Sequence, residues 1–128
     1  MLIHIVCWKY KPELDAAMRD EHREKLRALA SKIADIKSFE VGADILRLER
    51  SFDTGLVAHF EDTEGLDNYT NHAEHLAVAA LGKQIAEKVV SIDFLAPSSR
   101  ESVCARESKR FEICEHQKRA YLIGLFCG

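Results

Sequence analysis

Along most of the chain, segments with the apolar pattern of a β-strand alternate with segments whose apolar residues recur at the spacing of a helix. Residues 2–10, LIHIVCWKY, are almost continuously apolar and rich in residues that favour β structure, so they predict a well-buried strand that ends at Lys11-Pro12. Because the side chains of a strand point alternately to its two faces, every second residue is expected to share one face. On that face lie His4, Val6, Trp8 and Tyr10.

Residues 13–35 predict an amphipathic helix, because apolar positions recur at every third or fourth residue. The opposite side of this helix is densely charged and is expected to face solvent. One histidine falls inside the apolar row, where a hydrocarbon side chain is the usual choice. The row consists of Met18, His22, Leu26, Leu29 and Ile33.

Three more segments have the composition of strands. Residues 38–48 predict a second strand, in which Gly42 is expected to form a bulge or a bend. Residues 56–61 predict a third strand after a turn, and residues 90–95 a fourth.

Between the third and fourth strands the pattern predicts two helices separated by a break. A cap at position 62 or 63 begins a short helix that runs through Tyr69. Asn71, followed three residues later by Glu74, is a capping box in its asparagine form. A second helix is therefore expected from His72 to about Val89.

The order over residues 1–96 is β-α-β-β-α-β, which predicts an α+β fold of the ferredoxin-like kind. Such a fold has a four-stranded antiparallel sheet with helices on one face. Residues 1–97 are therefore expected to form one domain. Residues 98–128 differ in composition and form either a docked C-terminal helix or a loosely held tail.

Charge and hydropathy exclude several classes of protein. The 128 residues include 18 basic and 21 acidic side chains, so no large positive field is expected and nucleic-acid binding is not predicted. No apolar stretch approaches the roughly 20 residues that cross a bilayer, so no membrane span is expected. The first apolar run is too short for a signal peptide, and we expect a cytoplasmic protein.

The cysteines at positions 7, 104, 114 and 127 match no zinc-binding spacing and are expected to be free thiols. His72 and His75 are three residues apart, which alone is a weak metal signal. No metal or cofactor is therefore predicted.

Three predicted elements each carry a histidine in the row expected to be buried: His4, His22 and His75. Burying an imidazole without a partner costs roughly 1–3 kcal/mol, so each ring needs a hydrogen bond. If the three rings converge near Tyr69, they make a polar spot in an apolar pocket, which is typical of a small-ligand site. The alternative is that each histidine is a satisfied structural residue of the core.

Tyr69 and His75 would lie ~120° apart on one continuous helix, at 3.6 residues per turn. The predicted break at Asn71 allows them to face the same ligand. A histidine in such a pocket can act as a general base near neutral pH, and a tyrosine hydroxyl can hold a carbonyl oxygen.

Several short motifs resemble the stress-responsive dimeric α/β-barrel family, known as Dabb. They are the opening His4-Ile-Val-Cys-Trp-Lys-Tyr-Lys, Ser38-Phe-Glu-Val-Gly42, Phe60-Glu-Asp, Tyr69-Thr-Asn-His72-Ala-Glu-His75 and the closing Val90-Ser-Ile-Asp93-Phe94. The resemblance covers about residues 1–96. It implies ferredoxin-like protomers that pair sheet against sheet into a barrel. It therefore implies a homodimer with Ile3, Ile5 and Cys7 towards the shared interior.

The resemblance extends to olivetolic acid cyclase, a plant polyketide cyclase of this family. It implies that Tyr69 and His75 are catalytic and that His4 is a pocket histidine. The remaining positions that it places in or beside the pocket are Val6, Trp8, His22, Leu26, Leu56 and His72.

Three readings of function stay open at this point. The first is a stress-responsive dimeric barrel domain without catalysis, which acts in stress protection or binds a small, partly apolar molecule. The second is a cofactor-free enzyme of the polyketide-cyclase or monooxygenase type, with His75 as base and Tyr69 as hydrogen-bond donor. The third is a purely structural role for the histidines.

Overall fold

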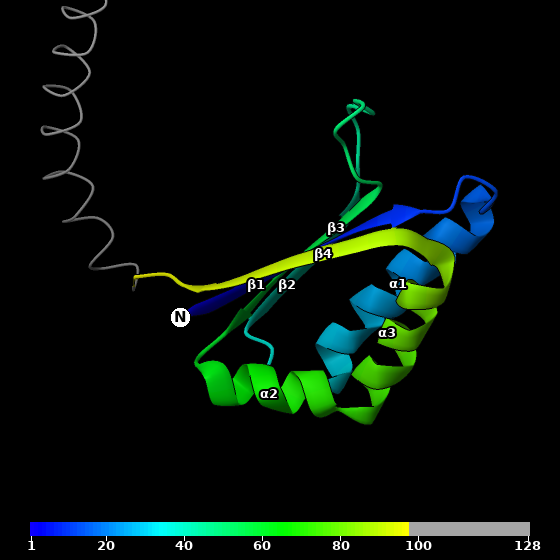
Figure 1. Cartoon of the computed structure of the whole chain (residues 1–128). Coiled ribbons are helices and arrows are strands. Elements are labelled where there is room, and N and C mark those ends of the chain that lie inside the picture. Colours follow the sequence, from blue (N-terminus) through cyan, green and yellow to red (C-terminus); the bar gives the residue numbers. More distant parts are fainter. Residues whose placement is uncertain (98–128) are drawn as a thin grey trace, which may run out of the picture. The chain divides into compact units, whose positions relative to one another are not determined.

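The computed structural model describes residues 1–97, and the predictions for residues 98–128 lie outside this range. Seven elements follow one another (Figure 1). They are β1 (Leu2–Tyr10), α1 (Ala16–Lys32), β2 (Ser38–Ala43), β3 (Thr54–Phe60), α2 (Thr63–Asn71), α3 (Ala73–Ile85) and β4 (Ala86–Leu95).

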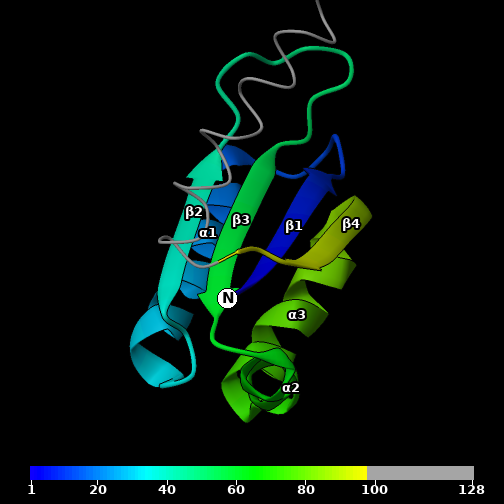
Figure 2. The same cartoon turned by 90° about the vertical axis from the view of Figure 1, so that its left-hand side faces the viewer.

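The four strands form one antiparallel sheet in the order β2-β3-β1-β4 (Figure 2). The central strand β1 pairs with β3 from Leu2↔Phe60 to Trp8↔Thr54, and with β4 on its other side. Helices α1 and α3 contact each other and lie on one side of the sheet (Figure 1). The predicted ferredoxin-like α+β fold is confirmed.

The hydrophobic core lies between the sheet and the helices. Alternate residues of β1 and β3 are buried there, as the period of two predicted, and the predicted row packs onto them from His22 to Ile33, whereas Met18 is 41% exposed. The buried set includes Val6, Trp8, Tyr10, Leu26, Leu29, Leu56, Phe60, Tyr69 and Ile85. Within residues 1–97, every helix falls short of the length and hydrophobicity that crossing a bilayer demands.

The second strand is shorter than predicted. It ends at Ala43, and one further bond in the same register, from the Asp44 amide to the Asp53 carbonyl at 2.9 Å, closes the base of a ten-residue connection. The expected bulge at Gly42 is wrong, since Gly42 pairs with Gly55 in regular register. An irregularity occurs between Lys9 and Tyr10, on β1 opposite β4.

The break between α2 and α3 is confirmed, but its cap is not the predicted residue. His72 is the N-cap of α3, and its Nδ1 accepts a hydrogen bond from the Glu74 amide at 3.2 Å. The Asn71 side chain donates instead to the Asp67 carbonyl at 2.9 Å. At the start of α2, Asp62 is the cap and accepts from the Gly65 amide at 2.9 Å.

Helix α3 ends four residues earlier than predicted, at Ile85. Strand β4 begins at the next residue, because its pairing with β1 extends to Tyr10↔Ala86. The Lys11 amide also bonds the Ile85 carbonyl at 3.1 Å, which fixes this corner. Long-range pairing therefore overrides a local sequence that favours helix.

Candidate functional site

His4, Tyr69 and His75 lie together at one end of the sheet, and we call them the Tyr69 cluster. The rings of Tyr69 and His75 have centroids 4.3 Å apart, and those of His4 and Tyr69 5.8 Å apart. The three residues come from β1, α2 and α3, so the break between the helices brings Tyr69 and His75 into contact. The structure thus brings together these three of the predicted residues.

Tyr69 is the buried member of the cluster. Its ring packs against Phe60 and Phe39, with centroids at 5.1 and 6.3 Å. Burial raises the pKa of the Tyr69 phenol well above its usual value, so the hydroxyl keeps its proton near neutral pH. Within residues 1–97 this hydroxyl makes no hydrogen bond, and it is not among the fully buried polar atoms, so a guest could reach this neutral donor.

His75 is half-buried, and one ring nitrogen is already engaged. Its Nδ1 donates to the Thr70 carbonyl at 3.0 Å, because a carbonyl oxygen only accepts. This bond assigns the proton to Nδ1 and leaves Nε2 as an acceptor. Burial lowers the pKa of His75 and outweighs the Thr70 bond, which raises it; the charges of His4 and His72 lower it further by smaller amounts. The ring is therefore neutral at pH 7 and able to take a proton.

His4 is held from the other side by β4. Its Nδ1 donates to a carboxylate oxygen of Asp93, the residue directly opposite it in the sheet. The side chain of His4 is 14% exposed and that of Asp93 is 42% exposed, so this ion pair lies near the surface. Asp93 thereby fixes the orientation of the His4 ring beside Tyr69.

His22 does not join this cluster, which corrects the expectation that all three histidines converge. Its Nδ1 contacts the Tyr10 hydroxyl at 2.7 Å, six residues further along β1 than His4. At about 3.3 Å per residue, six residues of strand span ~20 Å. The helical period gave the face on which His22 lies but not its position along the sheet.

Around His22 several polar groups bond one another, although His22 Nε2 is buried without a partner within residues 1–97. We call the set Tyr10, His22, Arg23 and Thr54 the His22 network. The Tyr10 hydroxyl donates to Thr54 Oγ1 at 2.9 Å, and Arg23 donates to the same oxygen at 3.0 Å. The His22 ring is fully buried, 5.2 Å from the Trp8 ring. Burial, and then the charges of Arg23 and Lys25, lower the pKa of His22 to about 4.

The other predicted site residues have ordinary structural surroundings. Val6, Trp8, Leu26 and Leu56 belong to the buried core, and His72 caps α3. Their expected role in ligand binding stays a prediction. Within residues 1–97, no three potential metal-binding side chains gather into a group.

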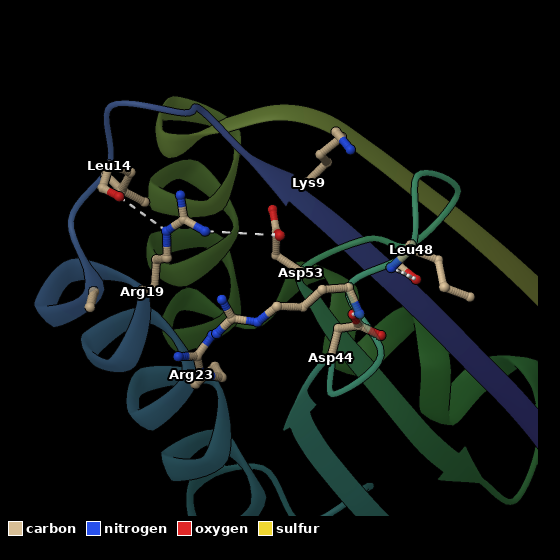
Figure 3. A pocket seen from close by; sticks show the side chains of 10 residues that line it. Lys9, Leu14, Arg19, Arg23, Asp44, Leu48 and Asp53 are labelled. Atoms are coloured by element: carbon tan, nitrogen blue, oxygen red, sulfur yellow. Dashed lines mark hydrogen bonds and ion pairs between the residues drawn. The ribbon is translucent and has the colours of Figure 1, made fainter.

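Three clefts are described on the domain, and none of them is lined by the Tyr69 cluster. One of about 500 Å³ lies on the open face of the sheet, and one of about 310 Å³ lies between α1 and α3. The third, of about 470 Å³, lies at the end of the sheet beside Arg19 and Arg23 (Figure 3). Sequence reasoning missed this last cleft, because it treated the charged side of α1 only as a solvated face.

Comparison with known proteins gives a consistent family. The family model described as "Stress responsive A/B Barrel Domain" (Dabb) matches residues 2–96. The stress-response A/B barrel domain-containing protein At5g22580 of Arabidopsis thaliana is 30% identical over 105 residues, covering 80% of this chain and 92% of that protein. An uncharacterized protein of Streptomyces coelicolor, SCO4036, is 29% identical over 96 residues, covering 71% of this chain and 96% of that protein.

Solved structures share the fold at lower identity. A dimeric ferredoxin-like protein of unknown function from Thermobifida fusca superposes with a TM-score of 0.69 at 21% identity, over 74% of this chain and 90% of that chain. A hydroxynitrile lyase from Passiflora edulis gives a TM-score of 0.69 at 19% identity, over 77% of this chain and 94% of that chain. At such identity the likeness concerns the fold alone. The likeness to olivetolic acid cyclase stays a prediction.

Proposed function

Because the chain belongs to the stress-responsive A/B barrel domain (Dabb) family, we propose that it is a homodimer that binds a small, partly apolar molecule at the Tyr69 cluster. One observation carries the proposal. The Tyr69 ring is buried among aromatic rings, its hydroxyl makes no hydrogen bond within residues 1–97, and the His75 ring lies 4.3 Å away. A bound carbonyl or hydroxyl oxygen would give this donor a hydrogen bond, which is worth about 1 kcal/mol net.

The proposed ligand is partly apolar because of what surrounds the polar atoms. Phe39 and Phe60 pack on the Tyr69 ring, while His4 and His75 provide polar edges. A few convergent polar groups in an apolar setting are typical of small-molecule sites. An aromatic carbonyl compound fits this combination.

The open face of the sheet supports the homodimer. No helix of the described domain covers it, and its side chains are largely apolar. The buried Nδ1 of His59 on this face has no partner within residues 1–97. Relatives of the same fold are described as dimeric. The apolar residues of this face are Ile3, Ile5, Cys7, Val57, Val90, Ile92 and Phe94.

Size-exclusion chromatography with light scattering, in the presence of reductant, tests the dimer. The wild type is expected at twice the mass of one chain. Ile92→Lys places a charge in the middle of the apolar face and is expected to shift the mass to that of one chain. A wild type that elutes as a stable monomer at micromolar concentration contradicts the proposal.

Titration with a panel of small aromatic ketones, followed by ¹H–¹⁵N NMR, tests the ligand site. Shifts are expected at His75 and around the start of α3. Tyr69→Phe removes only the hydroxyl and is expected to weaken binding about 5-fold or more, in line with about 1 kcal/mol for one hydrogen bond. Tyr10→Phe makes the same change in the His22 network and is the control. Equal weakening by both variants would refute a site at Tyr69.

A second function, acid–base catalysis, is favoured by the protonation states of the cluster. His75 Nε2 is a neutral base, and Tyr69 is a neutral donor 4.3 Å away between ring centroids. His75 would take a proton from the carbon next to a carbonyl group, while the electron pair moves onto the carbonyl oxygen held by Tyr69. The enolate carbon would then attack a second carbonyl, and His75 would return the proton to the new alkoxide.

Deuterium exchange at the methyl group of aromatic ketones measures the first of these steps. The rate is expected to fall about 10²–10⁴-fold in His75→Ala, the usual contribution of a general base. In the wild type the rate should be half-maximal below pH 6.5, because burial lowers the pKa of His75. A rate equal to that of buffer would exclude catalysis and leave binding intact.

The cytoplasm remains the proposed location, and no nucleic-acid partner is proposed. Fractionation of cells that express the tagged chain tests the location. Recovery of the chain in the membrane or secreted fraction would contradict it.

A further inference from the structure

The cleft beside Arg19 and Arg23 lies at the opposite end of β1 from His4, where β1 ends, α1 begins and the β2–β3 connection passes (Figure 3). Its volume of about 470 Å³ is within the range of roughly 300–1,000 Å³ that small-molecule pockets occupy. The cleft is lined by Lys9, Leu14, Ala16, Arg19, Arg23, Asp44, Arg47, Leu48, Ser51 and Asp53.

Positive charge predominates in this lining. Among the lining residues four basic side chains face two acidic ones, Asp44 and Asp53, and Asp20 beside the cleft pairs with Arg23, so a surplus of one positive charge remains. Both carboxylates already bind backbone amides. Asp44 accepts from the Arg47 amide at 2.6 Å, and Asp53 accepts from the Tyr10 amide at 2.8 Å. The acidic groups are thus partly occupied in holding the walls of the cleft.

Two of the arginines are held in place before any ligand arrives. Arg19 donates to the Leu14 carbonyl at 3.0 Å and lies 5.4 Å from the centre of the Tyr10 ring. Arg23 is 12% exposed and is fixed by Asp20 and by Thr54 of the His22 network. Guanidinium groups that are already ordered lose little further entropy when they bind an anion.

The other two basic residues of the lining come from β1 and from the β2–β3 connection. Lys9 and Arg47 make no ion pair within residues 1–97. Arg47 has a φ of 51°, the left-handed conformation that a non-glycine residue rarely adopts. The Asp44 cap on its amide sustains this conformation, which keeps Arg47 in the lining of the cleft. Backbone strain of this kind is concentrated at ligand-binding positions.

We propose that this cleft binds a small organic anion, with its carboxylate or phosphate group on Arg19, Arg23 and Arg47 and its apolar part against Leu14 and Leu48. Arginine matches both head groups because its planar fork donates two parallel hydrogen bonds. Figure 3 shows Arg19 pointing from α1 towards Asp53, with Leu14 and Leu48 at the margins. This site shares no residue with the Tyr69 cluster, so it goes beyond the proposed function.

NMR titration of the full chain at constant ionic strength tests the proposal with three probes: sodium hexanoate, sodium phosphate and the neutral hexanamide. Saturable shifts are expected around Arg19 and Arg47 with at least one of the two anions. Hexanoate alone indicates a carboxylate ligand, and phosphate alone indicates a phosphorylated one. Absence of saturation with both anions, or binding of hexanamide as tight as that of hexanoate, would overturn the proposal.

Matched variants separate a site from general charge attraction. Arg19→Gln and Arg47→Gln are each expected to weaken the anion about 5-fold or more, as for the loss of one charged hydrogen bond worth about 1–3 kcal/mol. Lys25→Gln removes one charge from the same helix outside the cleft and is expected to change affinity less than 2-fold, because exposed charges are screened. If Lys25→Gln weakens binding as much as Arg19→Gln does, the cleft is not an anion site. Arg47 lies in a connection, so that variant stays informative if Arg19→Gln unfolds.

Discussion

The domain contains two histidine–tyrosine contacts on the same face of one sheet, and they differ in how their polar atoms are satisfied. In the His22 network, Tyr10 bonds both His22 and Thr54, and the imidazole is fully buried. In the Tyr69 cluster, the phenol makes no hydrogen bond within residues 1–97 and His75 is half-buried. The same residue types thus serve the core at one end of the sheet and offer free groups at the other.

This difference teaches that access, and not residue identity, distinguishes a structural histidine from a candidate base, since both rings use Nδ1 in a bond and leave Nε2 without one. His22 and His75 both have a lowered pKa through burial. His22 keeps a buried Nε2 that no ligand reaches, because Gly82 packs against it. The following predictions test this comparison, from the largest expected effect to the smallest.

Replacing each histidine by alanine should separate the two regions most clearly. His22→Ala leaves a cavity and strips a partner from the buried Tyr10 hydroxyl, so it is expected to lower the free energy of unfolding by about 2–4 kcal/mol. His75→Ala removes a half-buried ring whose one described bond is to a backbone carbonyl, and should cost about 1 kcal/mol or less. Urea denaturation at fixed protein concentration measures both. Equal losses of unfolding free energy in the two variants would show that His22 and His75 do not differ in their structural role.

Gly82→Ala tests how tightly the His22 network is closed. An added Cβ would lie 2.9 Å from Trp8 Nε1 and 3.2 Å from His22 Nε2, so overpacking should cost about 1–3 kcal/mol. Gly65→Ala, in α2, is the matched control. Its Cβ would meet Phe60 at an ordinary 3.6 Å, and alanine is the better helix former, so that change should be neutral or stabilising by up to ~1 kcal/mol. Thermal unfolding compares the two, and a neutral Gly82→Ala would mean a looser packing than described.

The lowered pKa of His22 predicts a pH dependence of stability. The folded chain holds this ring neutral down to about pH 4, whereas the unfolded chain protonates it near pH 6.5. The unfolded state therefore binds more protons between these values, so stability present above pH 6.5 is lost as the pH falls towards 4. The slope is at most about 1.4 kcal/mol per pH unit for one group. Urea midpoints of the wild type and His22→Phe between pH 7 and 5 measure it, and an unchanged slope in the variant would reject the assignment.

Asp93→Asn should have the smallest effect on stability. The ion pair with His4 is near the surface, so its loss is expected to cost about 0–1 kcal/mol. Binding of an aromatic ketone should nevertheless weaken, because the His4 ring loses the partner that orients it. Unfolding and ligand titration of the same variant separate the two outcomes. A large loss of stability with unchanged affinity would assign His4 to the core.

The sequence predicted those parts of the fold that depend on local patterns. Period-two alternation gave the buried face of β1, including Val6 and Trp8, and the helical row gave Leu26 and Leu29. The break beside Asn71 was also predicted, and with it the approach of Tyr69 to His75.

What escaped prediction depends on groups that are distant in sequence. The start of β4 follows from pairing with Tyr10, and the position of His22 follows from the Tyr10 hydroxyl. The anion cleft is assembled from β1, α1 and the β2–β3 connection, so no single segment carries its signature. The cap at His72 was missed because imidazole seldom serves as a helix cap.

Helix α3 passes into β4 without an intervening residue, and the Lys11 amide secures the joint at 3.1 Å from the Ile85 carbonyl. Helix α3, which carries His75, is therefore joined directly to β4, which carries Asp93. On the other face of β4, the Ile92 side chain lies on the open face of the sheet. In the proposed homodimer, a second subunit packed on this face would contact the strand that orients His4 through Asp93, so dimerisation would also stabilise the proposed small-molecule site.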